Sequence, residues 1–274
     1  MGRAPISEHD ATEVIDELWP RMTQAQCLDA NYFNALWKEL SGHSEIEPVV
    51  PTDEVMWQRD LGRSLQVAFE WLGDLRGKRV LELGCGPGDY TIMMARRGAQ
   101  VTAIDIAPAS LTITSQRAQR SRADTAVHMC WMAAEGLAFP AGTFDWVVGF
   151  GLLHHADLAA LGPEVRRVLR SGGRALFREP LGINPALKLA RERLPYRAKR
   201  RSPNENPLGY AEINQVGRFF RATRVREFYL FSMLSRAVGG EMSFPALWAV
   251  DEFLIQRLPR VRRWCRYVLI EYAN

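Results

Sequence analysis

The chain has 274 residues, of which 47% are hydrophobic and 24% are charged, and its formal net charge is +4. This composition is typical of a globular protein and argues against a disordered chain. No apolar run approaches the roughly 18 residues that a membrane span requires, and the first residues lack the apolar core of a signal peptide. We therefore expect a cytoplasmic protein without a membrane span. The four cysteines are scattered, so neither a disulfide framework nor a metal site is expected.

The first part of the chain shows helical periodicity. Phe33, Leu36, Trp37 and Leu40 fall on one face of a helix, and apolar residues repeat this spacing from position 61 to position 72. Between the two segments, residues 42–51 contain two prolines, which predicts a loop.

Residues 79–90 read RVLELGCGPGDY and organise the rest of the chain. An apolar run is followed at once by Gly84, Gly86 and Gly88, which predicts a buried parallel strand that turns sharply into a helix. Glycine can adopt positive φ and lets a ligand approach the backbone, while the free N–H groups of a helix start favour electron-rich atoms. Because tight turns often collect glycine, this pattern alone does not identify a ligand site.

A second apolar strand, at residues 101–104, ends in Asp105. In a β-loop-α-β unit this strand lies beside the first, so its carboxylate would reach the ribose hydroxyls of a ligand on the glycine turn. Glu82 lies inside the first strand, which departs from a dinucleotide-binding pattern. A carboxylate at that point would lie near a positively charged amino acid moiety.

The following segments continue an alternating pattern of helices and strands. We expect a helix at 108–120, a strand at 126–131, a strand at 144–150, a helix at 158–169 that ends at Gly172 and Gly173, and a strand at 174–178. Ligands of open α/β sheets bind outside the carboxyl ends of the strands. His154, His155 and Glu179 should therefore lie at the same rim as the glycines.

Taken together, these motifs resemble those of the class I S-adenosylmethionine-dependent methyltransferases in order and spacing over about residues 78–180. The segments that carry the resemblance are Glu82 to Gly88, Asp105, Glu135 to Pro140, Phe144 to Val148 with Leu153, His154 and His155, and Leu169 to Gly173. The resemblance implies an α/β, Rossmann-like fold. Its sheet should have seven mostly parallel strands with the last one antiparallel, and helices should cover both faces.

The same resemblance implies S-adenosyl-L-methionine as cofactor. The residues expected to bind it are Glu82, Gly84, Cys85, Gly86, Gly88, Asp105, Ile106, Ala134, Glu135, Phe150 and His155. The sequence departs from the pattern of the family at Ala133, where family members often have an aspartate that accepts a hydrogen bond from the adenine amino group. Adenine would then be held by backbone groups near Ala134 and by apolar contact.

The resemblance also predicts three regions: a helical lid at 1–75, the cofactor-binding core at 76–180, and the rest of the core with substrate-cap insertions at 181–274. Within the lid, Tyr32, Trp37 and Trp57 either line the pocket or pack the helices onto the sheet. The last region contains a helix at 213–220, a strand at 224–231, a helix with Leu247, Trp248, Asp251, Leu254 and Leu258 on one face, and a final strand at 267–271.

Positive charge is concentrated in residues 181–274, where 17 Lys and Arg stand against 8 Asp and Glu. This excess indicates either an anionic partner or a solvated surface. The candidates for substrate binding in this region are Arg197, Arg200, Arg201, Tyr210 and Trp248.

We expect methyl transfer to a small, largely apolar natural-product precursor of secondary metabolism, either neutral or anionic. Transfer mainly requires that the nucleophile be held close and dry. In one version an isoprenyl diphosphate is methylated on carbon, with arginines on the diphosphate, aromatic rings beside the carbocation and Glu179 as the base. The alternative is O- or N-methylation of a small metabolite, with His154 or Glu179 taking the proton. A salt bridge of Glu179 with Arg178 or another arginine is the structural alternative.

Two other classes of protein fit the sequence less well. A nucleic-acid methyltransferase would agree with the pI of about 9.0, but no aromatic stacking platform accompanies the basic residues, and no nucleic-acid partner is expected. A non-catalytic cofactor-binding subunit disagrees with the intact glycine turn and Asp105. The sequence leaves a monomer and a homo-oligomer equally open.

Overall fold

The computed structural model describes residues 22–43, 45–59, 61–185, 187, 189, 202, 204–232 and 245–274. Three predicted substrate contacts, Arg197, Arg200 and Arg201, lie outside these residues, as do the first 21 residues of the predicted lid. Their roles stay predictions.

A seven-stranded sheet forms the centre of the protein, with strand order β3-β2-β1-β4-β5-β7-β6. Strands β1 to β5 are parallel to one another, and β7 is antiparallel to both of its neighbours, β5 and β6. The predicted fold class is therefore confirmed. The strands are β1 (Arg79–Leu83), β2 (Gln100–Asp105), β3 (Val127–Trp131), β4 (Phe144–Phe150), β5 (Leu169–Pro180), β6 (Ala222–Phe228) and β7 (Tyr267–Ala273).

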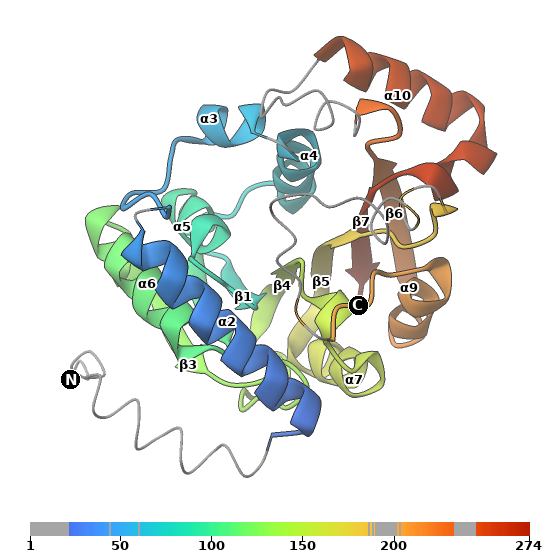
Figure 1. Cartoon of the computed structure of the whole chain (residues 1–274). Helices are drawn as coiled ribbons and strands as arrows, with labels where there is room; N and C mark the ends of the chain where they lie inside the picture. The colour runs from blue at the N-terminus through green and yellow to red at the C-terminus, as the bar shows by residue number, and fades with distance from the viewer. Residues whose placement is uncertain are drawn as a thin grey trace.

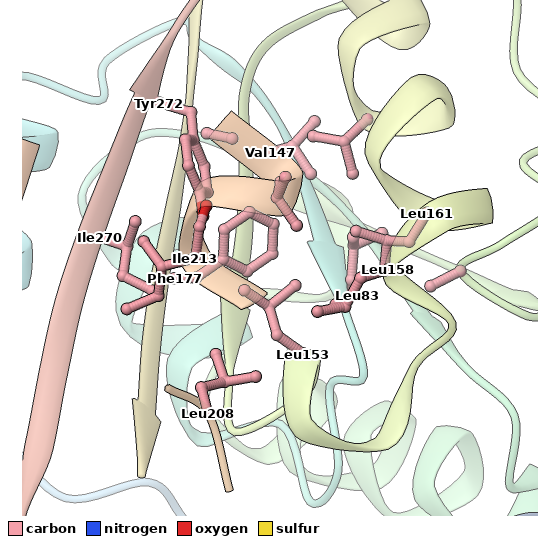
Figure 2. Close-up of a cluster of buried hydrophobic side chains, with 14 of the residues drawn as sticks. Leu83, Val147, Leu153, Leu158, Leu161, Phe177, Leu208, Ile213, Ile270 and Tyr272 are labelled. Carbon is pink, nitrogen blue, oxygen red and sulfur yellow. The ribbon is translucent and has the colours of Figure 1, made fainter. Parts of the chain in front are cut away.

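Helices cover both faces of this sheet (Figure 1). The apolar cluster on one face packs α7 and α9 against the strands, and its members include Leu161, Phe177 and Tyr272 (Figure 2). Successive strand residues point to opposite faces of the sheet, so the other face carries a second apolar cluster. This cluster packs α4 and α5 against the strands. The helices are α2 (Gln24–Gly42), α3 (Asp53–Gln58), α4 (Gly62–Leu72), α5 (Asp89–Arg96), α6 (Pro108–Arg120), α7 (Leu158–Val168), α9 (Tyr210–Gly217) and α10 (Pro245–Arg257).

Two sequence predictions about boundaries and faces are wrong. Gly172 and Gly173 do not end a helix; α7 ends at Val168, and the glycines lie inside β5, where Leu169 already pairs with Phe144. The position favours glycine, because a Cβ added at Gly173 would lie 3.0 and 3.1 Å from two backbone oxygens. Leu258, predicted on the apolar face of the last helix, lies one residue past the end of α10 and is 51% exposed.

The helix α2, drawn in blue in Figure 1, positions the N-terminal side of the site. It begins at a capping box in which Thr23 and Gln26 satisfy each other's backbone N–H groups. Asn34 then joins it to α6 by accepting a hydrogen bond from the Ala109 N–H at 2.9 Å. No helix within the described ranges is both long and apolar enough to cross a lipid bilayer.

Candidate active site

A cavity of about 330 Å³ lies at the carboxyl ends of β1, β2 and β4. This is the edge at which open α/β sheets bind ligands. The lining residues are Gln26, Asp29, Phe33, Trp37, Gly84, Cys85, Gly86, Pro87, Asp89, Tyr90, Ile104, Asp105, Ile106, Met132, Ala133, Ala134, Glu135, Phe150, Gly151, Leu152, His155 and Ala156. Of the eleven residues predicted to bind the cofactor, all but Glu82 and Gly88 are in this set.

The glycine turn forms the floor of the cavity. Gly84, Gly86 and Gly88 all have positive φ, at 69°, 52° and 83°. An added Cβ at Gly88 would lie 2.7 Å from Thr114, and one at Gly86 would lie 3.3 Å from the ring of Trp37. Gly88 thus serves the packing of α5 against α6, whereas Gly86 keeps the cavity open beneath α2.

Asp105 fixes the end of β2 against the glycine turn. Its two carboxylate oxygens accept backbone N–H groups, from Gly86 at 2.9 Å and from Ala107 at 2.8 Å. Each oxygen keeps a further lone pair, so the carboxylate can still accept from ligand hydroxyls. Burial raises the pKa of Asp105, and the backbone hydrogen bonds counteract that rise.

Glu82 is buried in β1 and does not line the cavity. The hydroxyl of Thr91 donates to one of its oxygens, while the other, Oε1, has no hydrogen-bond partner in the described part of the chain. Burial raises its pKa to about 8, and the nearby carboxylates of Asp89 and Asp105 add to the rise. A buried acceptor without a donor fits the amino group of the expected cofactor, which would supply both a proton donor and a positive charge.

The segment after β3 lines the opposite end of the cavity with Met132, Ala133 and Ala134. These small and apolar side chains agree with the predicted contact to adenine through backbone and apolar atoms. Glu135 does not point freely into this end, because Gln26 donates to its Oε2 at 3.0 Å and the Asp157 N–H to its Oε1 at 3.1 Å. It therefore joins α2 to the start of α7.

One face of α2 covers the cavity with residues that the sequence analysis did not single out as site residues. Gln26, Asp29 and Phe33, followed by Trp37, are spaced by three or four positions, so they share a helix face. That spacing was a readable signal, but it mixes polar with apolar residues. For Trp37 and Tyr32 the sequence left open whether they line the pocket or pack the helices onto the sheet. Trp37 lines the cavity, whereas Tyr32 packs edge-on against Phe33 and does not line it.

Glu179 lies beneath the loop that follows β4 rather than in the cavity. Its Oε1 accepts from the Leu152 and Leu153 N–H groups, both at 2.9 Å, and its Oε2 lies 2.7 Å from Nδ1 of His154. The side chain is fully buried, and neither it nor His154 lines the cavity. The loop amides need a buried acceptor, which explains this placement. The salt-bridge alternative with Arg178 is not observed, because consecutive β5 residues point to opposite faces.

His155 connects this loop to the covering helix. Its Nδ1 lies 3.3 Å from Oγ of Ser202 and 3.7 Å from Oδ2 of Asp29, and its ring meets Phe33 edge-on. Ser202 also donates to Asp29. Burial lowers the pKa of His155 to about 3, with His154 adding to the effect, and burial raises the pKa of Asp29.

The other predicted substrate residues lie away from the cavity. Trp57 packs on Phe69 beneath the guanidinium of Arg97, and Tyr210 donates from its hydroxyl to Glu227 at 2.8 Å. Trp248 lines a separate cavity of about 40 Å³ between α10 and β6. No described residue beyond 156 lines the larger cavity. The structure also has no group of three His, Cys, Asp or Glu able to hold a metal ion among the residues it describes.

Comparisons with known proteins agree with the arrangement around the glycine turn. Residues 80–173 match a family model described as "Methyltransferase domain". The ubiquinone biosynthesis O-methyltransferase of Xanthomonas oryzae pv. oryzae is 38% identical over 115 residues, which are 41% of this chain and 47% of that protein. The demethylmenaquinone methyltransferase of Thermus thermophilus is 34% identical over 131 residues, covering 46% and 54%. The chain thus spans about half the length of these relatives.

Solved structures share the fold over a larger part of the chain. Geranyl diphosphate C-methyltransferase from Streptomyces coelicolor A3(2) superposes with a TM-score of 0.56 at 19% identity, covering 77% of this chain and 79% of that one. A protein described as a cyclase superposes with a TM-score of 0.53, also at 19% identity, covering 77% and 80%. Because one fold carries both activities, the fold alone does not decide the reaction.

Proposed function

Residues 80–173 form a class I S-adenosylmethionine-dependent methyltransferase domain, and we propose that the whole chain is an enzyme that methylates an oxygen of a small, largely apolar molecule. The observation that carries this proposal is the cavity itself. Its lining combines the glycine turn with the aromatic side chains of Phe33, Trp37, Tyr90 and Phe150, of which the first two come from α2. A cavity of about 330 Å³ accommodates small molecules and no folded macromolecule.

Bound S-adenosylmethionine supplies a methyl group that is already activated for displacement. The glycine turn, Asp105 and the segment Met132 to Ala134 would hold it, and Glu82 would face its amino group. The chain must then hold the acceptor close to the methyl and exclude water. Phe33 and Trp37 on α2 perform both tasks, because they cover the cavity and offer ring faces to a flat or apolar acceptor.

Oxygen is the favoured acceptor because carbon methylation needs a base that removes a proton after transfer, whereas an oxygen that is already ionised needs none. The scheme for carbon methylation needs Glu179 beside the substrate as this base, yet both oxygens of Glu179 are engaged by the loop after β4. Carbon methylation of an isoprenyl diphosphate remains the second candidate, supported by the aromatic rings of Tyr90 and Phe150, whose faces stabilise a cation. One relative, the ubiquinone biosynthesis O-methyltransferase, is named for methylation of oxygen, which supports the first proposal.

The test is methyl transfer from labelled S-adenosylmethionine to a panel of phenols, amines and geranyl diphosphate, with the methyl located by mass spectrometry. We expect label on oxygen of one or more phenols. Label on carbon of geranyl diphosphate would replace this proposal with the second candidate. Failure to bind S-adenosylmethionine by isothermal titration would remove the enzyme proposal altogether.

A further inference from the structure

Arg178 is a buried guanidinium next to the cavity. It lies on β5 opposite Phe150 of β4 and is 7% exposed. Its hydrogen-bond partners among the described residues are the Tyr90 hydroxyl at 2.8 Å and the Leu61 carbonyl at 3.4 Å, and its Nε has none. Neither partner is a carboxylate, so in the described structure the charge lacks a counter-ion.

Aromatic rings surround this guanidinium in place of a carboxylate. The rings of Tyr90, Phe150 and Tyr267 lie 5.4 to 5.8 Å from its central carbon. Burial opposes the charge, but the neighbouring tyrosine oxygens raise the pKa of Arg178 above its ordinary value. Cation–π contacts compensate only part of the cost of burying a charge. A negative charge on a ligand would compensate the rest.

Tyr90 connects Arg178 to the cavity. It follows the glycine turn on α5, lines the cavity, and packs against Phe150 with ring centroids 4.2 Å apart and the ring planes tilted by 36°. Because Arg178 donates to the Tyr90 oxygen, the tyrosine keeps its own proton for a second hydrogen bond. Burial raises the pKa of Tyr90, so this proton stays in place at neutral pH. The result is a neutral donor backed by a permanent cation.

Among the described residues that line the cavity, no side chain is a free base: Asp89 pairs with Arg117, and Glu135 accepts hydrogen bonds from Gln26 and Asp157. His155 loses most of its basicity through burial, and the carboxylate of Asp29 already accepts from Ser202. Glu179 lies outside the cavity. An acceptor hydroxyl that reacts here must therefore be ionised by its surroundings rather than by a dedicated base.

We propose that Tyr90, positioned and polarised by Arg178, binds an anionic oxygen on an aromatic ring of the methyl acceptor. This inference rests on the proposed function and names the class of its substrate. The acceptor hydroxyl releases its proton to solvent on binding. Its oxygen lone pair then forms the new O–C bond as the methyl–sulfur bond breaks, and the electrons of that bond stay on sulfur.

The site also discriminates against other acceptors. Methylating a neutral amine creates a positive charge near the guanidinium, and an alkene acceptor creates a carbocation there. Both charges are repelled by Arg178, whereas an oxygen anion is attracted. Tyr90 is thus a binding residue for the acceptor and Arg178 a positioning residue.

The test uses binding of 4-nitrophenol, 4-nitrobenzoate and nitrobenzene to the full chain loaded with S-adenosylhomocysteine. We expect the 4-nitrophenolate anion to bind about tenfold or more tightly than neutral nitrobenzene, and a preference for 4-nitrobenzoate alone would contradict the inference. Phenolate absorbance should show bound 4-nitrophenol ionised at a lower pH than the free compound. Tyr90→Phe, which keeps the ring against Phe150, should weaken anion binding by about 10- to 100-fold and leave the binding of nitrobenzene and of S-adenosylhomocysteine unchanged.

The matched control is Tyr267→Phe, which removes a hydroxyl from another ring beside Arg178 that does not line the cavity. It should leave all three affinities unchanged. Arg178→Met should abolish the preference for anions and raise the pH at which bound 4-nitrophenol ionises; if this variant misfolds, Tyr90→Phe decides alone. Equal binding of nitrobenzene and the anions, equal losses in both tyrosine variants, or no probe binding to a protein that binds S-adenosylhomocysteine would each overturn the inference. The last outcome leaves the proposed methyl transfer intact.

Discussion

The two sides of the cavity are built in different ways. Every lining residue from the core lies between 84 and 156, inside the matched methyltransferase domain, and a strand, its turn and the next strand place most of them. The covering side comes from α2, which is held by distant contacts such as Gln26 to Glu135 and Asp29 to Ser202. The core side is therefore determined locally, while the covering side depends on tertiary contacts.

The largest expected effect is at Asp105, on the locally determined side. Asp105→Ala removes the acceptor for the Gly86 and Ala107 N–H groups and the expected acceptor for two ribose hydroxyls. Hydrogen bonds to a charged group contribute about 1.5–3 kcal/mol each. We expect S-adenosylhomocysteine to bind on the order of 100-fold more weakly or worse, as measured by isothermal titration.

The control for this variant is Asp124→Ala, which removes an exposed aspartate from the turn before β3. It should bind S-adenosylhomocysteine as the wild type does. Circular dichroism must show that both variants are folded. A folded Asp105→Ala protein with unchanged affinity would mean that the cofactor is held elsewhere.

The next effect is at Glu179, which holds the loop after β4. Glu179→Gln loses the charge that two backbone N–H groups share and turns an amide toward His154. A loss of about 1–3 kcal/mol would lower the melting temperature by roughly 2–10 °C. If Glu179 were the predicted base instead, activity would collapse with no change in melting temperature.

A buried carboxylate on the neighbouring strand provides the comparison. Glu271 of β7 has a single long contact, 3.5 Å from a half-exposed Arg174. Glu271→Gln should therefore lower the melting temperature by less than Glu179→Gln does. Equal decreases in melting temperature would show that the hydrogen bonds of Glu179 to the loop stabilise the protein no more than the contact of Glu271 with Arg174 does.

The positions of most residues predicted to bind the cofactor follow from the sequence because their signals are local. Gly84 and Gly86 follow a strand directly, and Asp105 ends the next one, so their places result from the chain direction in a parallel sheet. Glu82 was also predicted, and its unpartnered oxygen fits the predicted role. A turn that requires positive φ leaves few alternative residues.

The contacts of the other predicted site residues could not be predicted in the same way, since the position of a residue at the end of a strand or on a helix face does not determine its partners. Glu179 was placed correctly at the end of its strand, but the loop amides that engage it are more than twenty residues away. Trp57 and Trp37 belong to similar aromatic helices, yet only Trp37 faces the cavity. Helical periodicity identifies a buried face without telling what lies opposite.

The smallest expected effect is the dependence of stability on pH through His155, at the junction of the two sides. Its pKa is about 3 in the folded protein, below the roughly 6.5 of an unfolded chain, so the unfolded state binds more protons between these values. The contribution of His155 to the free energy of unfolding is present in full above about pH 6.5 and is lost as the pH falls toward 3. From pH 7.5 to 5.5 this loss amounts to about 1.4 kcal/mol, or roughly 3–5 °C in melting temperature.

His155→Asn keeps a group able to meet Ser202 but cannot titrate, so on going from pH 7.5 to 5.5 its melting temperature should fall by roughly 3–5 °C less, or rise by that much more, than that of the wild type. Glu82, whose raised pKa stabilises the folded state as pH falls, contributes equally to both proteins. Asp29 acts in the opposite direction, because its raised pKa favours the folded state as pH falls toward its own titration, which is why the comparison stops at pH 5.5. His128→Asn, at an exposed position on β3, should retain the wild-type difference. If His155→Asn also retains it, the imidazole is not buried against α2, and the covering helix must lie away from the cavity in solution.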